Sequence, residues 1–323
     1  MLSDKLIKNL TESIKKEFQL YNVYIGDNIK FKSLIYKYEN WRKRFIEKRK
    51  RKVLYSKEIY QNDNFIQYQK IISKIEHKFK NAEDITPYLS KGIVDNPYIQ
   101  NSRSNSKDKD LFLNAFGIHH LHLGKKFEER DKNGINFIER TGDSLYILLK
   151  NNEVFFIDIL MHDFYNEDLF RIIKNNWNHL LEPFKMSYDP PQSNTMTNDN
   201  KKKLLKVGIN MIISIDNDTY ALSELAMDGS SSEDIYFVSS ILKELEYFEE
   251  WLISNNDLVL NEIQKLSGKY IDKINTKMII SNGQLFIVEV NTEVTLVING
   301  NSDEVVFLKD YCPENSYSFS FNK

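Results

Sequence analysis

Two apolar runs separated by a short polar segment constrain the fold of this chain most. The runs are residues 145–149 and 154–161, and the four residues between them read Lys-Asn-Asn-Glu. Asparagine tolerates the positive φ of a tight turn, so this pattern predicts a β-hairpin. The second run is apolar on both faces except at Asp158, which is typical of a strand in the middle of a sheet. The sequence therefore predicts an antiparallel sheet in the central part of the chain.

The segments on either side of the hairpin extend this central module. Residues 118–123 lie between Gly117 and Gly124 and read as another strand, and residues 135–140 are a further candidate strand. After the hairpin, Asn166 is suited to cap a helix with a regularly spaced apolar stripe. We expect this helix to dock on the small sheet.

The N-terminal region has the periodicity of helices. Apolar residues recur every three or four positions in three segments of residues 1–80, which predicts about three helices. We place a helical region at residues 1–83 and the central α+β module at 84–185. Residues 186–203 hold two prolines and several turn formers, and we expect them to form a linker.

The C-terminal region, residues 204–323, combines both kinds of pattern. Helices are expected at residues 233–253 and 258–266, and strands at 207–215, 278–280, 285–290, 294–298 and 305–308. Asn-Gly pairs at 282–283 and 299–300 favour tight hairpin turns. The whole chain is therefore predicted to be α+β, with a helical N-terminal region, a small central antiparallel sheet with a docked helix, and a C-terminal α+β region.

Composition narrows the class of protein. The chain has 323 residues, of which 41% are hydrophobic and 28% charged, and its apolar runs are too short to cross a bilayer. The N-terminus lacks the apolar core of a secretory signal, and the single cysteine, Cys312, cannot form an internal disulfide. We therefore expect a cytoplasmic protein without a membrane partner.

Positive charge is concentrated in one segment, although the formal net charge is only −2. Residues 42–52 read RKRFIEKRKRK, with eight basic residues and one glutamate. Such a run can dock on phosphates by releasing counterions, or it can be a solvated helix face. Arg49 and Arg51 are the members that we expect to contact a nucleic acid.

The histidines indicate where chemistry is to be sought. Residues 117–124 read GIHHLHLG, and strand alternation places His120 and His122 on one face and His119 on the other. If the leucines face the core, the pair faces outward, into solvent or a cleft. Two neighbouring imidazoles can act as general acid and base or chelate a divalent metal; an exposed pair without a function is the alternative.

Other polar groups are expected near the same strand ends. Asp158 lies in the apolar run FFIDIL, where a carboxylate needs a partner, and His120, His122 or Arg140 could supply one. An ordinary buried hydrogen-bond acceptor is the alternative. Further groups of the candidate site are His162, Lys126, Arg140 and Tyr146. These groups together could cleave RNA without a metal.

The central segment resembles the RelE/ParE-type toxin fold of small metal-independent ribonucleases. The segments that carry the resemblance are HHLHLG and ERTGDSLYILLKNNEVFFIDILMHDF. Arg140 matches the basic position before the family's hairpin, and His162 matches the position after it. The resemblance covers about 65 of the 323 residues and implies a ribonuclease of the toxin or phage-defence kind, with an inhibitory protein as its partner.

These observations lead to three functional hypotheses. The first is a ribonuclease without metal or cofactor, in which His120 and His122 are acid and base, Asp158 orients an imidazole and His162 is an additional base. Lys126, Arg140, Tyr146, Arg49 and Arg51 would bind the RNA. The second is a non-catalytic regulator that binds nucleic acid or protein through the basic run. The third is a metal-dependent hydrolase that uses His120, His122, Asp158 and His162 as ligands.

Overall fold

A computed structural model shows an α+β protein that divides into two compact units. The structure describes residues 2–309 except 22, 24, 26–27, 94–109, 132–133, 151, 162–165, 188–195, 223–224, 227–230, 282–283 and 300–303. The first unit takes the described parts of residues 1–20, 25–39 and 234–323. The second takes those of residues 21–24 and 40–233. These units divide the chain differently from the boundaries expected at residues 83, 185 and 203, because both ends of the chain contribute to the first unit.

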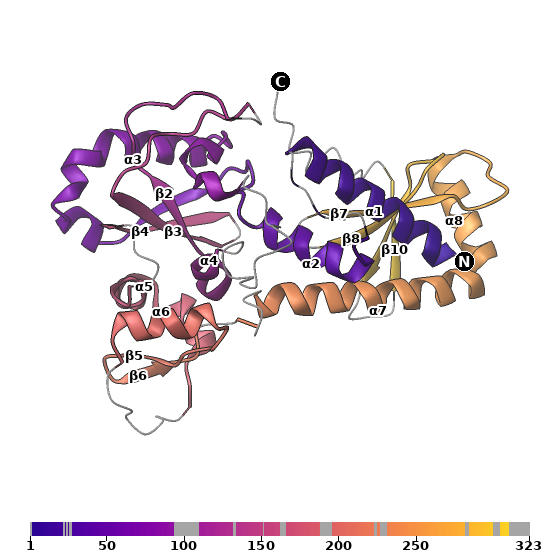
Figure 1. Ribbon diagram of the computed structural model, residues 1–323. Helices are drawn as coiled ribbons and strands as arrows, with labels where there is room; N and C mark the ends of the chain where they lie inside the picture. Colours follow the sequence, from indigo (N-terminus) through magenta and orange to yellow (C-terminus); the bar gives the residue numbers. More distant parts are fainter. Residues whose placement is uncertain are drawn as a thin grey trace. The chain divides into compact units, whose positions relative to one another are not determined.

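The first unit combines helices with a four-stranded antiparallel sheet (Figure 1). Its helices are α1 (Leu2–Leu20), α2 (Phe31–Arg42, of which residues 31–39 belong here), α7 (Ser232–Ser254) and α8 (Asn256–Ser267). Its strands lie in the order β10-β9-β8-β7 and span Thr276–Ser281 (β7), Gln284–Glu289 (β8), Thr295–Asn299 (β9) and Glu304–Leu308 (β10). Two of the three expected N-terminal helices, both expected C-terminal helices and the four strands expected after residue 277 are confirmed here, with bounds shifted by a few residues. The third N-terminal helix, α3 (Asn64–Lys80), belongs to the second unit.

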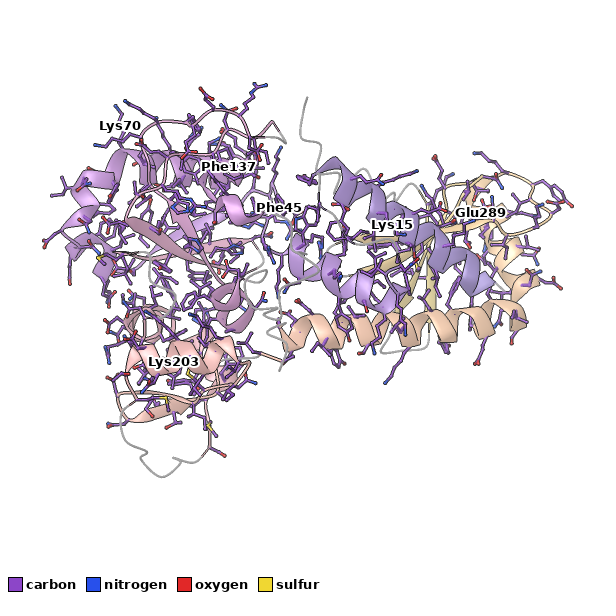
Figure 2. The ribbon with its side chains drawn as sticks, in the orientation of Figure 1. Lys15, Phe45, Lys70, Phe137, Lys203 and Glu289 are labelled. Carbon is purple, nitrogen blue, oxygen red and sulfur yellow. The ribbon has the colours of Figure 1, made fainter. Side chains whose placement is uncertain are left out.

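A buried carboxylate shapes the connection between β8 and β9. Glu289 is fully buried and accepts hydrogen bonds from the backbone amides of Asn291 (3.0 Å) and Thr292 (2.8 Å) and from the Thr292 hydroxyl (2.7 Å). Figure 2 labels this residue. Glu293, four residues after Glu289, has a φ of +60°. These bonds satisfy the carboxylate inside the unit, where an unpaired charge would be costly.

The second unit is built on a four-stranded sheet in the order β1-β4-β3-β2. The strands are β1 (Lys52–Tyr55), β2 (Ile118–His122), β3 (Asp143–Lys150) and β4 (Glu153–Met161). The β3–β4 hairpin closes between Lys150 and Glu153, as the sequence predicted. Strand β1 was not predicted, and it runs parallel to β4, so this sheet is mixed rather than purely antiparallel.

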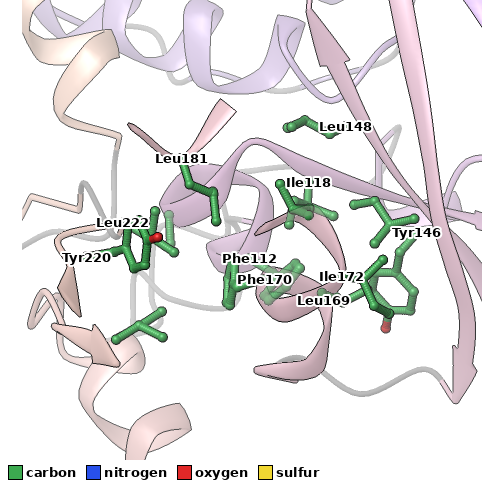
Figure 3. Close-up of a cluster of buried hydrophobic side chains, with 14 of the residues drawn as sticks. Phe112, Ile118, Tyr146, Leu148, Leu169, Phe170, Ile172, Leu181, Tyr220 and Leu222 are labelled. Carbon is green, nitrogen blue, oxygen red and sulfur yellow. The ribbon is translucent and has the colours of Figure 1, made fainter. Parts of the chain in front are cut away.

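Helices cover both faces of this sheet. Helix α3 (Asn64–Lys80) contacts β1 and β4, and its Phe79 packs edge-on against Phe156 of β4. On the other face lie α4 (Leu111–Phe116) and α5 (Asp168–Trp177), the helix predicted after Asn166. Figure 3 shows Leu169 and Ile172 of α5 beside Tyr146 of the sheet. Because both faces are packed, the central strands are apolar on both sides.

The remaining elements of the second unit complete the core beside α5. They are α6 (Asn198–Lys206) and the hairpin of β5 (Ile213–Ile215) and β6 (Asp218–Tyr220). Short 3₁₀ turns span Glu58–Gln61 (η1), Thr86–Tyr88 (η2), Lys91–Ile93 (η3), Asn178–Leu180 (η5) and Glu182–Phe184 (η6). Three expectations need correction. The expected linker at 186–203 contains the first turns of α6, and the strand expected at 207–215 is confined to β5. The candidate strand at 135–140 forms one isolated bridge, between Ile138 and Phe127.

The basic run is not the helix face that one interpretation of the sequence expected. Helix α2 ends at Arg42, and the following residues form turns and extended chain before β1. Arg44 is buried and donates to the Asn40 side chain (3.2 Å) and to the Gly92 carbonyl (3.4 Å). Arg51 is also buried, and its guanidinium donates to the Glu47 carbonyl at 2.7 Å. At least two of the eight cations therefore have structural roles.

Within the residues that the structure describes, no helix combines the length and apolarity needed to cross a bilayer.

Candidate functional site

The histidine pair belongs to a row of side chains that crosses three neighbouring strands. His120 on β2 lies opposite Tyr146 on β3, and Tyr146 lies opposite Asp158 on β4. Directly opposed residues project from the same face of a sheet, with Cβ atoms about 5 Å apart. The row therefore places an imidazole, a phenol and a carboxyl group in sequence on one face; we call it the polar row.

A second pair flanks the polar row. His122 lies opposite Ser144, two residues along from His120 and Tyr146 on the same face. The ring centroids of His120 and His122 are 5.7 Å apart, and those of His120 and Tyr146 are 6.4 Å apart. The predicted neighbourhood of the two imidazoles and Tyr146 is thus present in the structure.

The burial of the pair differs from the outward orientation expected from the leucines. His122 is only 4% exposed and His120 is half-buried. On the same face, Ile118 and Tyr146 belong to the core cluster that includes residues of α4 and α5. Tyr146 is 3% exposed and packs edge-on against Phe112 of α4, with ring centroids 6.1 Å apart. Of the two imidazoles, His120 is the one that solvent reaches more easily.

His119 lies on the opposite face, as strand alternation predicted. It pairs with Ile147, which pairs with Phe156 beneath α3. Burial lowers the pKa of His119 to about 4, and the positive charges of Arg51 and Lys43 act in the same direction against the carboxylate of Asp110. The imidazole is therefore neutral at physiological pH, and part of the basic run acts on the interior of this unit.

Asp158 has a partner that the sequence did not indicate. Its Oδ1 atom accepts hydrogen bonds from Asn62 Nδ2 (2.8 Å) and from the backbone amide of Ile159 (2.8 Å). Burial raises the pKa of Asp158, and these two hydrogen bonds only partly oppose that effect. Because β3 separates β4 from β2, the strand spacing puts about 10 Å between the backbones of Asp158 and His120. Asp158 therefore does not orient that imidazole directly, and Asn62 takes the place expected for His120, His122 or Arg140.

Ser144 is another residue that sequence reasoning missed. It is fully buried, and its hydroxyl has no hydrogen-bond partner among the residues that the structure describes. Buried hydroxyl groups nearly always have a partner, so such an exception requires an explanation. In the sequence Ser144 follows Gly142 and Asp143 at a strand start and looks like a turn residue. Only the pairing register reveals that it lies opposite His122.

The expected phosphate ligands lie on a loop that leaves the sheet beyond His122. Lys126 and Arg140 are both exposed, and the hydrogen bond from the Glu139 amide to the Lys126 carbonyl (2.9 Å) holds their segments side by side. Gly124 permits this close approach, because a Cβ atom there would lie 2.3 Å from the Glu139 carbonyl oxygen. The segments that carry the two cations therefore lie side by side beyond the end of β2.

The other predicted site residues are not part of this arrangement. Arg49 is half-buried next to Glu47, with Nε 3.8 Å from its carboxylate, and Arg51 is buried within the basic run. His162 lies outside the described residues. Among those that are described, no three histidine, cysteine or acidic residues are grouped as metal ligands.

No protein-family model matches this chain, and no curated protein or solved structure is significantly similar to it.

Proposed function

We propose that the protein is a metal-independent ribonuclease of the toxin or phage-defence kind, with its active site at His120 and His122. The observation that carries the proposal is the pair of imidazole rings 5.7 Å apart, opposite Tyr146 and Ser144 on the neighbouring strand. Imidazoles titrate near neutral pH and can both accept and donate a proton there.

In the proposed reaction, one imidazole accepts the proton of a ribose 2′-hydroxyl while the 2′-oxygen forms a bond to the adjacent phosphorus. The bond from phosphorus to the 5′-oxygen breaks, and the other imidazole, which is protonated, donates its proton to that oxygen. Lys126 and Arg140 at the end of β2 would stabilise the additional negative charge. His120 is the member of the pair that RNA meets first, because it is less buried than His122.

Asp158 has a different role in this proposal from the one expected from the sequence. Its carboxyl group is held by Asn62 and by the Ile159 amide, and Tyr146, which lies between it and His120, donates its hydroxyl to the Met161 carbonyl at 3.4 Å. We therefore assign Asp158 to positioning the β4 end of the polar row. His162, Arg49 and Arg51 remain proposed contributors to base catalysis and RNA affinity, and RNA and an inhibitory protein remain the proposed partners.

The test is cleavage of a labelled RNA by the purified protein in EDTA. We expect wild type to cleave it and His120→Gln to cleave it at least about 100-fold more slowly, which is the usual contribution of a general acid or base. His77→Gln and His179→Gln are the matched controls, because both of these histidines are exposed. Absence of cleavage by wild type, or equal cleavage by His120→Gln with an unchanged circular dichroism spectrum, would contradict the proposal.

A non-catalytic regulator is the second candidate, and the exposed cations Lys48, Lys50 and Lys52 favour it. In this case wild type would bind nucleic acid without cleaving it, and binding would be lost in a Lys48→Ala/Lys50→Ala/Lys52→Ala variant. Binding and cleavage measured on the same RNA thus separate the two candidates.

A further inference from the structure

Three aromatic side chains form a ladder at the edge of the second unit. Tyr55 and Tyr60 are stacked, with ring centroids 5.6 Å apart and an interplanar angle of 27°, and Phe65 meets Tyr60 edge-on at 5.2 Å. Tyr60 is 60% exposed, whereas Tyr55 and Phe65 are half-buried. We call these three residues the aromatic ladder.

The ladder is held rigidly from behind. The Tyr55 hydroxyl donates to Glu76 of α3 at 2.8 Å, and the Tyr55 ring packs on buried Phe156 with centroids 5.0 Å apart. The Ser56 hydroxyl donates to the Ile157 carbonyl (2.6 Å) and accepts from the Ile59 amide (3.0 Å), which fixes the turn that carries Tyr60. An exposed ring on a fixed backbone can stack on a ligand without losing much conformational freedom.

Positive charge lies next to the ladder in the chain. Lys57 precedes Tyr60 by three residues and is exposed. On α3 the exposed residues Ile66, Lys70 and Lys74 follow at intervals of four and so share one helix face. Figure 2 labels Lys70 at the surface. Residues 57–74 contain only two acids: Asp63, which is exposed, and Glu58, which accepts from the Asn176 side-chain amide at 2.6 Å.

The ladder also adjoins the polar row. Asn62 lies between Tyr60 and Phe65 in the chain, and its amide holds both the Asp158 carboxylate (2.8 Å) and the Ile159 carbonyl (2.7 Å). The loop that presents the ladder is therefore bonded to the carboxylate end of the proposed catalytic face.

We propose that the aromatic ladder binds single-stranded RNA, with a base stacked on Tyr60 and the phosphates near Lys57, Lys70 and Lys74. Stacking on an exposed aromatic ring needs an unpaired base, and neighbouring cations match the charge of the backbone. A duplex keeps its bases stacked internally and offers no such face. This inference deepens the proposed function, since it names single-stranded RNA as the substrate class. That the bound RNA is then cleaved rests on the proposed function.

The experiment measures fluorescence anisotropy of a labelled 12-nucleotide single-stranded RNA with the full chain carrying His120→Gln, which is expected to slow turnover. We expect Tyr60→Ala in this background to weaken binding about 10-fold, in the range that one stacked base provides. Tyr60→Phe should bind within about twofold of its parent, since the ring is retained. Tyr270→Ala is the matched control, because Tyr270 is 84% exposed on the other unit and should leave binding unchanged.

Several outcomes would overturn the inference. One is equal binding by the parent and Tyr60→Ala; another is equal affinity for the RNA and its duplex. Absence of binding together with Tyr60-dependent self-association in sedimentation would assign the ladder to a contact between copies instead. Tyr60-dependent binding by a wild-type protein that cleaves nothing would support the ladder and contradict the ribonuclease, so the two proposals fail separately.

Discussion

Asn62 donates its side-chain amide to the carboxylate of Asp158 over 2.8 Å, across 96 positions of sequence. The same nitrogen also donates to the Ile159 carbonyl, and the side-chain oxygen Oδ1 of Asn62 accepts from the backbone amide of Asn64 (2.9 Å). One amide therefore joins the start of α3 to the end of β4. It also gives a buried carboxyl group a neutral partner rather than a cation, which is why burial can raise the pKa of Asp158.

The raised pKa predicts how stability depends on pH. The folded protein binds a proton at Asp158 more tightly than the unfolded chain does, so protonation of Asp158 stabilises the fold. This stabilisation is fully present below the pKa of the unfolded chain. It is lost as pH rises through the raised pKa of the folded state. We expect the free energy of unfolding of wild type, relative to Asp158→Asn, to fall from pH 4 to pH 7 in urea titrations. Asp63→Asn, at an exposed position, is the control, and a constant difference between wild type and Asp158→Asn would contradict the assignment.

His119 predicts a pH dependence of the opposite sign. Its pKa of about 4 lies below that of an unfolded histidine, so the unfolded chain binds more protons between these values and stability falls as the solution becomes acidic. The difference corresponds to about 3 kcal/mol between pH 7 and pH 4. We expect His119→Gln to lose this part of the dependence while exposed His77→Gln retains it. An NMR titration that places the His119 pKa near 6.5 would refute the prediction.

Alanine substitution should affect stability differently at Arg44 and at Lys50, although both residues belong to the basic run. Removing the buried guanidinium of Arg44 leaves the Asn40 oxygen and the Gly92 carbonyl without their donor, so Arg44→Ala should lower the free energy of unfolding by about 1–3 kcal/mol. Lys50 is exposed, and Lys50→Ala should change stability by less than about 0.5 kcal/mol. Urea titration of both variants checks this contrast; equal effects would show that Arg44 is not buried in solution.

Gly124 and Gly142 offer a matched pair of glycines. A Cβ atom at Gly124 would lie 2.3 Å from the Glu139 backbone oxygen, whereas one at Gly142 would meet nothing within 4 Å. We expect Gly124→Ala to destabilise the protein by about 1–3 kcal/mol, as overpacking does. Because the collision separates the segments of Lys126 and Arg140, it should also reduce RNA cleavage. Gly142→Ala should behave like wild type in thermal unfolding, and similar melting temperatures for both variants would refute the close approach.

The sequence predicted the elements whose patterns are local. The β3–β4 hairpin follows from two apolar runs and an Asn-Asn turn, and α5 follows from its apolar stripe. The parity of His119 against His120 and His122 was also predictable, because side chains alternate in any strand. The burial of the face that carries His120 and His122 was not predictable, since each face of β2 has one apolar residue and at least one histidine.

Features that depend on pairing between distant segments were not predictable. Strand β1 has four residues after a charged run, and only its register with β4 identifies it as a strand. Asn62 looks like an ordinary residue before a helix, and Ser144 looks like part of a turn. Their importance arises from neighbours 96 positions away in one case and on the next strand in the other.

The parallel pairing of β1 with β4 has a consequence for biosynthesis. The bond from Ser56 to Ile157 spans 101 positions, so β1 leaves the ribosome long before its partner strand exists. At about 5–20 residues per second, the nascent chain carries this unpaired strand for roughly 5–20 s. A short β-prone segment that waits in this way is at risk of joining another nascent chain, and dense flanking charge opposes such encounters. The basic run immediately before β1 would thus protect the nascent chain from aggregation before the run has any role in the folded protein.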